Sequence, residues 1–303
     1  MLKTAALTVG QSKLVWGSRT YLMGILNITP DSFSGDGLLS GKDQPDYVQQ
    51  ALEQARHFVA AGVDMLDVGG ESTRPGSQPV ALERELERVL PVVRALAAEL
   101  DALISIDTYK SQVAEAALEA GAQLVNDVWG LRADPQLAVV ARRFNAPLIL
   151  MHNRSSWVHA EVKEKLGGHY VGMEYENLLE DVKRELLESV ALAHEGGVPD
   201  EQIILDPGIG FGKTVEQNLE LIDRLDEIRQ LGYPILLGPS RKSFIGYTLD
   251  LPPDQRIEGT AAGVAVGIVR GADIIRVHDV AYMSRVARMT DAIVRRAPAL
   301  PHS

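Results

Sequence analysis

The sequence of 303 residues predicts a single α/β domain, a (β/α)8 or TIM barrel with a short N-terminal β-hairpin. Short and almost entirely apolar runs alternate with amphipathic helical segments, which is typical of parallel strands buried on both faces. Eight such strand–helix units fill the chain, and eight is the number that closes a barrel of this kind. Polar residues stand at the carboxyl end of every apolar run. An open, doubly wound sheet uses the same local alternation and is the competing architecture.

The elements are expected in a regular order. Residues 1–20 are predicted to form the hairpin, because short apolar runs there are separated by glycine and polar turn residues. The whole chain, 1–303, is expected to be one domain, with the barrel over 21–298 and a tail over 299–303. Most of the expected helices end near a glycine, which is a common helix stop. Strands are expected at 21–29, 64–70, 103–108, 123–128, 147–152, 203–208, 234–240 and 273–278, and helices at 47–62, 81–100, 111–121, 135–144, 175–197, 215–232, 257–272 and 280–297.

Composition excludes several classes of protein. The net charge is −11, which argues against a general surface for nucleic acid or for anionic membranes. The chain has no cysteine, so disulfides, thiolate metal sites and cysteine nucleophiles are excluded. The first residues lack the apolar core of a signal peptide, and no apolar run approaches the ~20 residues that span a bilayer. We therefore expect a soluble cytoplasmic protein with no membrane partner.

The stretch LDPGIGFGKTVEQNLELI, from Leu205 to Ile222, looks like a phosphate-binding loop but does not match one. In the pattern G-x-x-x-x-G-K-[ST] the first glycine falls at Pro207, which has no N–H to offer a phosphate. The dinucleotide pattern G-x-G-x-x-G fails at Lys213. Neither nucleotide site is supported, and Lys213 with Thr214 is expected only to begin a helix.

The carboxyl ends of the strands in such a barrel converge on one mouth, where the chemistry of these enzymes occurs. Asp107, Asn126 and Asp206 stand inside otherwise apolar runs, so burial would be unfavourable for them without a partner. Polar residues at the other predicted strand ends include Asn27, residues 69–74, Met151–His152, residues 240–242 and residues 276–278.

These residues divide into two chemical groups. Asp107, Asn126 and Asp206 are acceptors and suit a flat heterocycle that presents several N–H donors. Arg74, Arg276 and His278 are cationic and suit phosphate, for which arginine's planar fork is a good match. Arg276 and His278 are two residues apart on a strand, so their side chains should point the same way. The combination predicts a site for a phosphorylated cyclic metabolite.

Several motifs carry a resemblance to a known family. They are MGILNITPDSFSGDG, LDVGGESTRPGS, SIDTYK, VNDVWG, LMHNR, LDPGIGFGKT, GPSRKSFIG and GTAAGVAVGIVRGADIIRVHDV, in this order along the chain. On these residues the sequence resembles the dihydropteroate synthases, the folate-pathway enzymes that sulfonamides inhibit. The resemblance covers the chain from about Tyr21 to the last helix.

The resemblance implies roles for the matched pterin-site residues. Asp206 should accept hydrogen bonds from the amino and ring N–H edge of a pterin, Asn126 should bond the same edge, and Asp107 should face the reduced ring. Lys242 should reach the carbonyl side of the pterin. Met151 is expected to contact the bound substrate.

It also implies the anion and arylamine sites. Asn27, with Asp31 nearby, should help to hold Mg2+ on the substrate diphosphate, because that ion prefers oxygen ligands. The pyrophosphate should be held by Arg74, Arg276 and His278. The p-aminobenzoate slot should be formed by Thr73, Pro75, Phe211 and Ser240.

The implied reaction joins 6-hydroxymethyl-7,8-dihydropterin diphosphate to p-aminobenzoate, with Mg2+ as cofactor. The carbon–oxygen bond breaks first to leave a pterin cation, with Asp107, Lys242 and Arg276 as the catalytic residues. In this family the last helices pair two subunits, so we expect a homodimer. The partners are therefore small molecules and a second copy, not nucleic acid.

Three alternatives share part of the pattern. A pterin-binding methyltransferase domain serving a corrinoid protein would keep the acceptor pocket without needing the STRPG, SRKSF and RVHDV segments. A non-catalytic pterin-binding subunit would keep the pocket without turnover. A Schiff-base aldolase using Lys242 would leave the three acceptors unexplained.

Other polar residues are expected to be structural. His152 is expected to have a structural role, and Glu71 is expected to fix its neighbouring loop. The charge run ALERELERVL is predicted to be a solvated helix face. The segment NRSSWVHAEVKEKLGGHY, residues 153–170, is assigned no element.

Overall fold

The computed structural model describes residues 2–29, 47–72, 79–156, 159–163, 165–171 and 174–296. Its centre is an eight-stranded parallel sheet in the order β10-β7-β6-β5-β4-β3-β12-β11. A bridge between Leu205 and Ile235 joins the two ends, so the sheet closes into a barrel and the open-sheet alternative is excluded. The strands are β3 (Tyr21–Asn27), β4 (Met65–Gly69), β5 (Leu103–Asp107), β6 (Leu124–Asp127), β7 (Leu148–Met151), β10 (Ile203–Asp206), β11 (Leu236–Leu237) and β12 (Ile274–Val277).

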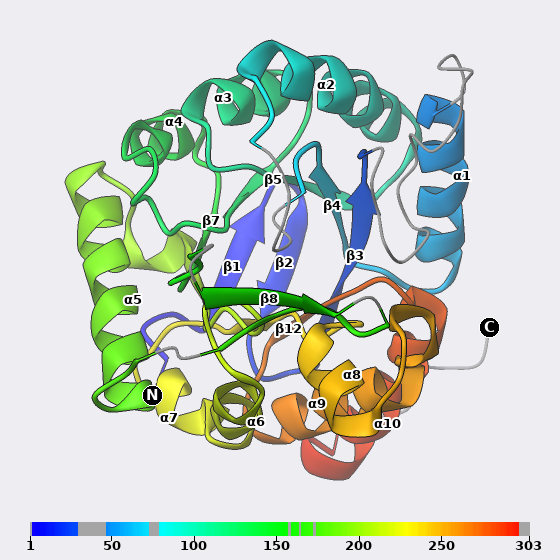
Figure 1. Cartoon of the computed structure of the whole chain (residues 1–303). Coiled ribbons are helices and arrows are strands. Elements are labelled where there is room, and N and C mark those ends of the chain that lie inside the picture. The colour runs from blue at the N-terminus through cyan, green and yellow to red at the C-terminus, as the bar shows by residue number, and fades with distance from the viewer. Residues whose placement is uncertain are drawn as a thin grey trace.

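Helices surround this barrel, as Figure 1 shows. They are α1 (Tyr47–Ala60), α2 (Leu82–Glu99), α3 (Ser111–Glu119), α4 (Gln136–Phe144), α5 (Leu178–Glu195), α6 (Val215–Asp223), α7 (Leu225–Arg229), α8 (Ser243–Leu249), α9 (Ile257–Val269) and α10 (Val280–Val294). The single helix predicted over 215–232 is wrong. The backbone of Arg224, at φ −108° and ψ 25°, leaves helical geometry and divides the segment into α6 and α7.

The predicted N-terminal hairpin is confirmed, with β1 (Ala6–Val9) paired to β2 (Ser12–Val15). It lies behind the barrel in Figure 1, at the end away from the viewer. Its buried side chains form one apolar cluster with two residues from the inner wall of β3 and one from each other barrel strand, and so they close the amino-terminal end. The hairpin side is Leu7, Val9, Leu14 and Trp16, and the barrel side is Tyr21, Met23, Met65, Leu103, Leu124, Ile149, Ile204, Leu236 and Ile274.

Side chains alternate between the inside and the outside of the barrel along every strand. Residues adjacent to the inner cluster, such as Leu66, Ile104 and Ile275, belong instead to the outer core under the helices. Counting by twos from the inner cluster therefore identifies the side chains that point inward nearer the mouth. The inward positions are Ile25, Asn27, Asp67, Gly69, Ser105, Asp107, Asn126, Met151, Asp206, Gly238 and Arg276.

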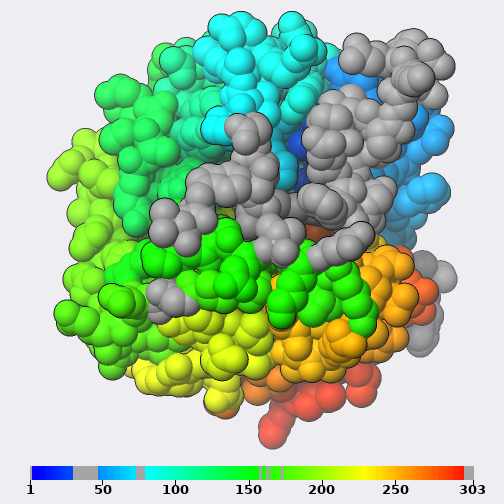
Figure 2. All heavy atoms as spheres, viewed as in Figure 1, coloured from blue at the N-terminus to red at the C-terminus, as the bar shows by residue number. Residues whose placement is uncertain are grey.

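A second hairpin, β8 (Ala160–Lys163) with β9 (Gly167–Tyr170), interrupts the connection between β7 and α5. The hairpin docks against α8. The hydroxyl of Tyr247 donates to the carbonyl of Gly167 at 3.2 Å, and the ring centres of His169 and Tyr247 are 4.0 Å apart. In Figure 2 its green atoms form a band across the viewed face, beside the orange surface of α8. The hairpin was not predicted from the sequence.

Within the described ranges, no helix combines the length and the apolar character needed to cross a membrane. The cytoplasmic location expected from the sequence stays a prediction.

Candidate active site

The predicted site residues that the structure describes lie together at the carboxyl ends of the strands. The strand register aligns Asn27 with Gly69, Gly69 with Asp107, and Asp107 with Asn126. On the other side of the barrel, Asp206 aligns with Met151. Thr73, Arg74, Pro75 and Asp31 lie outside the described residues.

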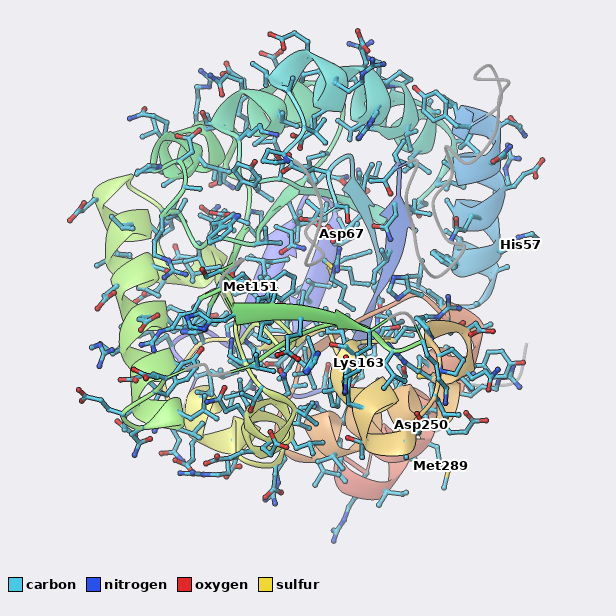
Figure 3. All side chains as sticks on the ribbon, viewed as in Figure 1. His57, Asp67, Met151, Lys163, Asp250 and Met289 are labelled. Atoms are coloured by element: carbon cyan, nitrogen blue, oxygen red, sulfur yellow. The ribbon has the colours of Figure 1, made fainter. Side chains whose placement is uncertain are left out.

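Asp67 links two of the predicted residues and was missed by the sequence analysis. Its Oδ2 accepts a hydrogen bond from Nε of Arg276 at 2.6 Å and another from the amide of Asn126 at 2.9 Å. Nη2 of Arg276 donates to Oδ2 of Asp107 at 2.7 Å. Figure 3 shows Asp67 inside the ring of strands, whereas His57 and Met289 lie outside it. The signal was available, since Asp67 has the same inward orientation as Met65 two residues earlier.

In the structure without ligands, the predicted acceptor group and the predicted cationic group are in direct contact. Arg276 is bound to two carboxylates of the floor, because its inward direction from β12 brings its guanidinium between Asp67 and Asp107. His278 lies instead beside Ser240, with Nδ1 3.0 Å from the serine Oγ. The backbone N–H of His278 also donates to that oxygen, at 3.2 Å.

The turn after β10 positions Lys242. The N–H of Gly208 donates to Oδ1 of Asp206 at 2.7 Å. The ammonium of Lys242 donates to the carbonyl of Ile209 and lies 4.6 Å from the centre of the Phe211 ring. Gly210 has φ +82°, and a Cβ on it would lie 2.9 Å from Cδ of Lys242, so the lysine stem lies directly over the turn.

Lys213 has a larger role than the predicted helix start. It is 2% exposed, and its ammonium donates to the carbonyls of Gly208 and Phe211 at 2.9 and 3.0 Å. The same nitrogen lies 2.9 Å from Nδ1 of the buried His152. Only Thr214 behaves as predicted, since it caps α6 in a capping box.

His152 is enclosed on both sides. Its Nε2 lies 3.1 Å from Glu185 of α5, opposite Lys213. Burial, reinforced by the neighbouring Lys213, lowers the pKa of His152 to about 3. The imidazole is therefore neutral at physiological pH and packs as a structural element, in agreement with the role expected from the sequence.

Burial dominates the electrostatics of the floor. It raises the pKa of Asp107 to about 7, with Arg276 opposing the shift and Asp67 adding to it. Burial also raises the pKa of Asp206, against the attraction of Lys242. The pKa of Lys242 is lowered to about 8 by burial, which Asp206 partly offsets. These mutual effects place Asp107, Asp206, Lys242 and Arg276 within one electrostatic cluster.

Two inward-facing glycines leave the floor open. A Cβ on Gly69 would lie 3.5 Å from Cβ of Asp107. A Cβ on Gly238 would lie 3.8 Å from Cβ of Arg276 and 3.9 Å from Nζ of Lys242. Because neither position carries a side chain, a flat ligand can approach the charged groups closely.

Lys110 anchors the rim beyond β4. Its ammonium donates to Glu71 and to Glu85, each at 2.5 Å, and to the carbonyl of Val80 at 2.8 Å. The hydroxyl of Tyr109 also donates to Glu71, at 3.0 Å, which is consistent with a loop-fixing role for that glutamate. The predicted solvated face of α2 is wrong at Glu85, which is buried by this contact with Lys110.

The metal site predicted at Asn27 has few protein donors among the described residues. Asn27 is half-buried at the end of β3. No group of three His, Cys, Asp or Glu side chains within the described ranges could hold a metal ion. An amide oxygen alone suits Mg2+ only if a ligand supplies most of the other oxygens, as a diphosphate with waters does.

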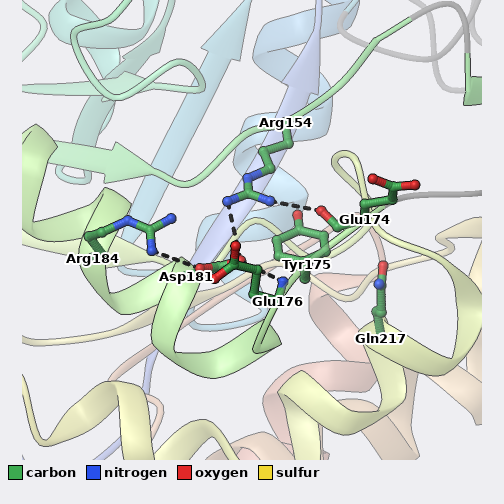
Figure 4. A pocket seen from close by; sticks show the side chains of 7 residues that line it. All are labelled: Arg154, Glu174, Tyr175, Glu176, Asp181, Arg184 and Gln217. Carbon is green, nitrogen blue, oxygen red and sulfur yellow. Dashed lines mark hydrogen bonds and ion pairs between the residues drawn. The ribbon is translucent and has the colours of Figure 1, made fainter.

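Two hollows lie away from the floor cluster. One, of about 450 Å³, is lined by Tyr109, Trp129, Arg132 and Ala133. The other, of about 610 Å³, lies beside α5 and is shown in Figure 4. There Asp181 pairs with both Arg154 and Arg184, so the two arginines that line this hollow are already bound to a carboxylate. Neither lining contains a predicted site residue.

Comparison with known proteins decides the family. A sequence model of the family described as pterin binding enzyme matches residues 23–278. The dihydropteroate synthase of Clostridium beijerinckii is 50% identical over 289 residues, which covers 95% of this chain and 99% of that protein. The chain belongs to the dihydropteroate synthase family.

Solved structures of dihydropteroate synthases share the fold. One from Clostridium difficile, determined in the presence of pteroic acid, has a TM-score of 0.82 at 48% identity and covers 92% of this chain and 98% of that chain. One from Xanthomonas albilineans, with 4-aminobenzoic acid, has a TM-score of 0.84 at 34% identity and covers 98% of this chain and all (100%) of that chain. Dihydropteroate synthases are transferases of folate synthesis, and this chain is an enzyme of that class.

Proposed function

We propose that this enzyme condenses 6-hydroxymethyl-7,8-dihydropterin diphosphate with p-aminobenzoate to give 7,8-dihydropteroate and pyrophosphate. The observation that carries the proposal is the inward-facing cluster of Asp107, Asn126 and Asp206 with Arg276 and Lys242 at one end of a single barrel. Support also comes from relatives, since the Clostridium difficile structure was determined in the presence of pteroic acid and the Xanthomonas albilineans structure with 4-aminobenzoic acid.

The pterin is proposed to lie flat over the floor. Asp206 accepts from its amino and ring N–H groups with the oxygen that Gly208 does not occupy. Asn126 uses its amide N–H on Asp67, which leaves its carbonyl oxygen for the same edge of the ring. Met151 covers one side of the ring, and Lys242 reaches its carbonyl. Among the described residues, neither the second oxygen of Asp206 nor the carbonyl oxygen of Asn126 accepts a hydrogen bond, so the pterin would supply each with a donor.

The bond that breaks joins the exocyclic methylene carbon to the diphosphate oxygen, and its electron pair leaves with pyrophosphate. The amine nitrogen of p-aminobenzoate then forms the new bond to that carbon and loses a proton. Asp107 beside the ring stabilises the positive charge, and Arg276 with His278 and Arg74 stabilises the negative charge on the leaving group. A Mg2+ ion bound to the diphosphate, with Asn27 as a protein ligand, would supply further positive charge there.

The p-aminobenzoate is proposed to occupy a slot nearer the mouth. Phe211 contributes its ring, and Ser240 contributes a hydroxyl whose position is set by His278. Thr73 and Pro75 complete the slot in this proposal. The ammonium of Lys242 over the face of Phe211 joins this slot to the pterin floor.

One assay tests the reaction. Purified protein is mixed with Mg2+, the dihydropterin diphosphate and p-aminobenzoate, and pyrophosphate release is followed. Release only in the complete mixture is the expected result. No release in the complete mixture, despite pterin binding, would instead indicate a methyltransferase domain or a non-catalytic pterin-binding subunit.

We also propose a homodimer formed through α9 and α10. Large apolar side chains on these helices are exposed in the monomer, at Val266, Val269, Tyr282, Met289 and Ile293. An apolar surface of this kind marks an interaction site. Light scattering during gel filtration tests the proposal, since it requires twice the monomer mass of 33.0 kDa.

A further inference from the structure

We infer that Arg276 is a pivoting cation: Asp67 holds its Nε end permanently, whereas Asp107 holds its Nη2 end only until the substrate diphosphate takes it. Asp67 is thus a positioning residue, and Asp107 and the diphosphate compete for the same N–H group. The inference rests on the proposed function for the identity of the anion.

The two carboxylates lie at different depths. Asp67 pairs in register with Ser105, and Asp107 is two residues nearer the mouth on the same strand as Ser105. Nε is the guanidinium nitrogen nearest to the Arg276 backbone, and it is bound to the deeper Asp67. Nη2 lies at the tip and is bound to Asp107 at the strand end. A rotation about the Nε end therefore moves the tip toward the mouth without breaking the deeper contact.

Asp67 cannot give up Arg276 without a large penalty. Its side chain is 0% exposed, and Oδ1 has no hydrogen-bond partner among the described residues. Within the described part of the chain, its Oδ2 accepts hydrogen bonds only from Arg276 and from the neutral amide of Asn126. Loss of the guanidinium would leave a buried charge without a counterion, which proteins tolerate poorly.

Asp107, unlike Asp67, can release Arg276 when the substrate binds. Its side chain is 12% exposed and lies where the reduced ring of the pterin is proposed to sit. When Nη2 leaves, the carboxylate faces the ring on which positive charge develops, so its lost counterion is replaced during the reaction. Within the described residues, no group accepts a hydrogen bond from Nη1, so the tip has a second donor for the anion. One movement thereby prepares both ends of the bond that breaks.

The test compares the affinity of magnesium pyrophosphate, measured by calorimetry, for the wild type and three variants. Asp67→Asn, Asp107→Asn and Asp206→Asn each remove one negative charge from the same floor. If only the loss of a negative charge mattered, pyrophosphate would bind more tightly to all three variants.

The pivot predicts at least about fivefold tighter pyrophosphate binding in Asp107→Asn than in Asp206→Asn, because the carboxylate that competes for Nη2 is gone. It predicts about tenfold weaker binding in Asp67→Asn, because the anchor is gone. Tighter binding in Asp67→Asn, or equal gains in the other two, overturns the inference.

A double-mutant cycle covers the case in which Asp67→Asn does not fold. Lysine has no Nε–Nη fork, so Arg276→Lys cannot keep one carboxylate while it offers a second N–H to the anion. The gain in pyrophosphate affinity from Asp107→Asn should be present in the protein with Arg276 and absent in the Arg276→Lys background. An equal gain in both backgrounds would contradict the pivot.

The bare pterin, titrated into the same proteins, separates positioning of Arg276 from a general distortion of the floor. Its affinity should fall less than about threefold in Asp67→Asn, and an equal loss for both ligands would favour a merely structural role. The outcome does not depend on turnover. If the pyrophosphate affinities follow the predicted order but the protein makes no dihydropteroate, the proposed function is refuted and the pivot is not.

Discussion

The ammonium of Lys242 lies 4.6 Å from the centre of the Phe211 ring, so one cation borders both proposed substrate positions. The same ammonium is bound to the turn that carries Phe211, through the carbonyl of Ile209. The charges of Asp206, Arg276 and Asp107 also shift the pKa of Lys242. The protonation state of this lysine therefore links the pterin floor to the arylamine slot.

The first prediction concerns pH. Lys242, with its pKa lowered to about 8 by burial, loses its charge above that pH, and Asp107, with its pKa raised to about 7 by burial, loses its charge below that pH. The profile of kcat/KM against pH should be a narrow bell with limbs near these two values. Lys242→Arg should remove the alkaline limb, because arginine stays charged. A flat profile between pH 6 and about 9 in the wild type would contradict this assignment.

The second prediction concerns pterin recognition. Asp206→Ala removes a charged hydrogen-bonding partner worth roughly 1.5–3 kcal/mol, so pterin affinity should fall by about one to two decades. Calorimetry with the bare pterin measures the loss. Asp223→Ala, which changes an exposed carboxylate on α6, is the matched control and should leave the affinity unchanged. Wild-type affinity in the Asp206 variant would remove Asp206 from the site.

The third prediction concerns Lys213. Lys213→Met removes the donor to Gly208 and Phe211, so the turn that positions Phe211 loosens. We expect the KM for p-aminobenzoate to rise about tenfold, which corresponds to about 1.4 kcal/mol, with a smaller change for the pterin. Thr214→Ala, which weakens the α6 cap by about 1 kcal/mol, should lower stability without this change in KM. Equal KM values for the two variants would show that Lys213 only supports the fold.

The fourth prediction concerns stability at two glycines with positive φ. A Cβ on Gly208 would lie 1.8 Å from the carbonyl oxygen of His152, whereas a Cβ on Gly10 would meet nothing within 4 Å. Gly10→Ala should cost about 1–2 kcal/mol from backbone strain alone. Gly208→Ala should cost clearly more, because the turn must also move away from His152. Denaturant unfolding measures both, and equal losses would contradict the close packing of this turn.

The fifth prediction concerns assembly. Ile293→Glu places a charge on α10 at a side chain that is 67% exposed in the monomer. If α10 lies in the dimer interface, the buried charge should shift gel filtration toward the monomer. Val139→Glu, on the exposed face of α4, is the control and should leave the mass unchanged. A dimer that survives both substitutions would place the interface elsewhere.

The sequence predicts the barrel well because each strand is a short apolar run, and the structure places a strand within every such run. The hairpin Ala160–Lys163 with Gly167–Tyr170 could not be predicted in that way, because its residues are mainly polar and glycine. Its stability depends on contacts with α8 that are distant in sequence. The break at Arg224 likewise lies within a continuous helical pattern.

Among the site residues, those at strand ends were found because polar side chains interrupt apolar runs there. Asp67 was missed because it lies one step inside its strand, although its inward direction follows from Met65. Lys213 was misjudged because its burial depends on His152, which comes from a different strand end. The ion pairs of Arg276 depend on the depth of two other strands and could not be read from local sequence.

The apolar plug of Leu7, Val9, Leu14 and Trp16 makes the barrel a blind-ended chamber. Among the described residues, this closed end leaves the carboxyl side of the strands as the route by which a molecule reaches the floor. In the proposed reaction the pterin must bind first, because an arylamine bound nearer the mouth would block its route. The product must leave by the route through which both substrates entered. Initial-rate kinetics should accordingly show a compulsory order of addition.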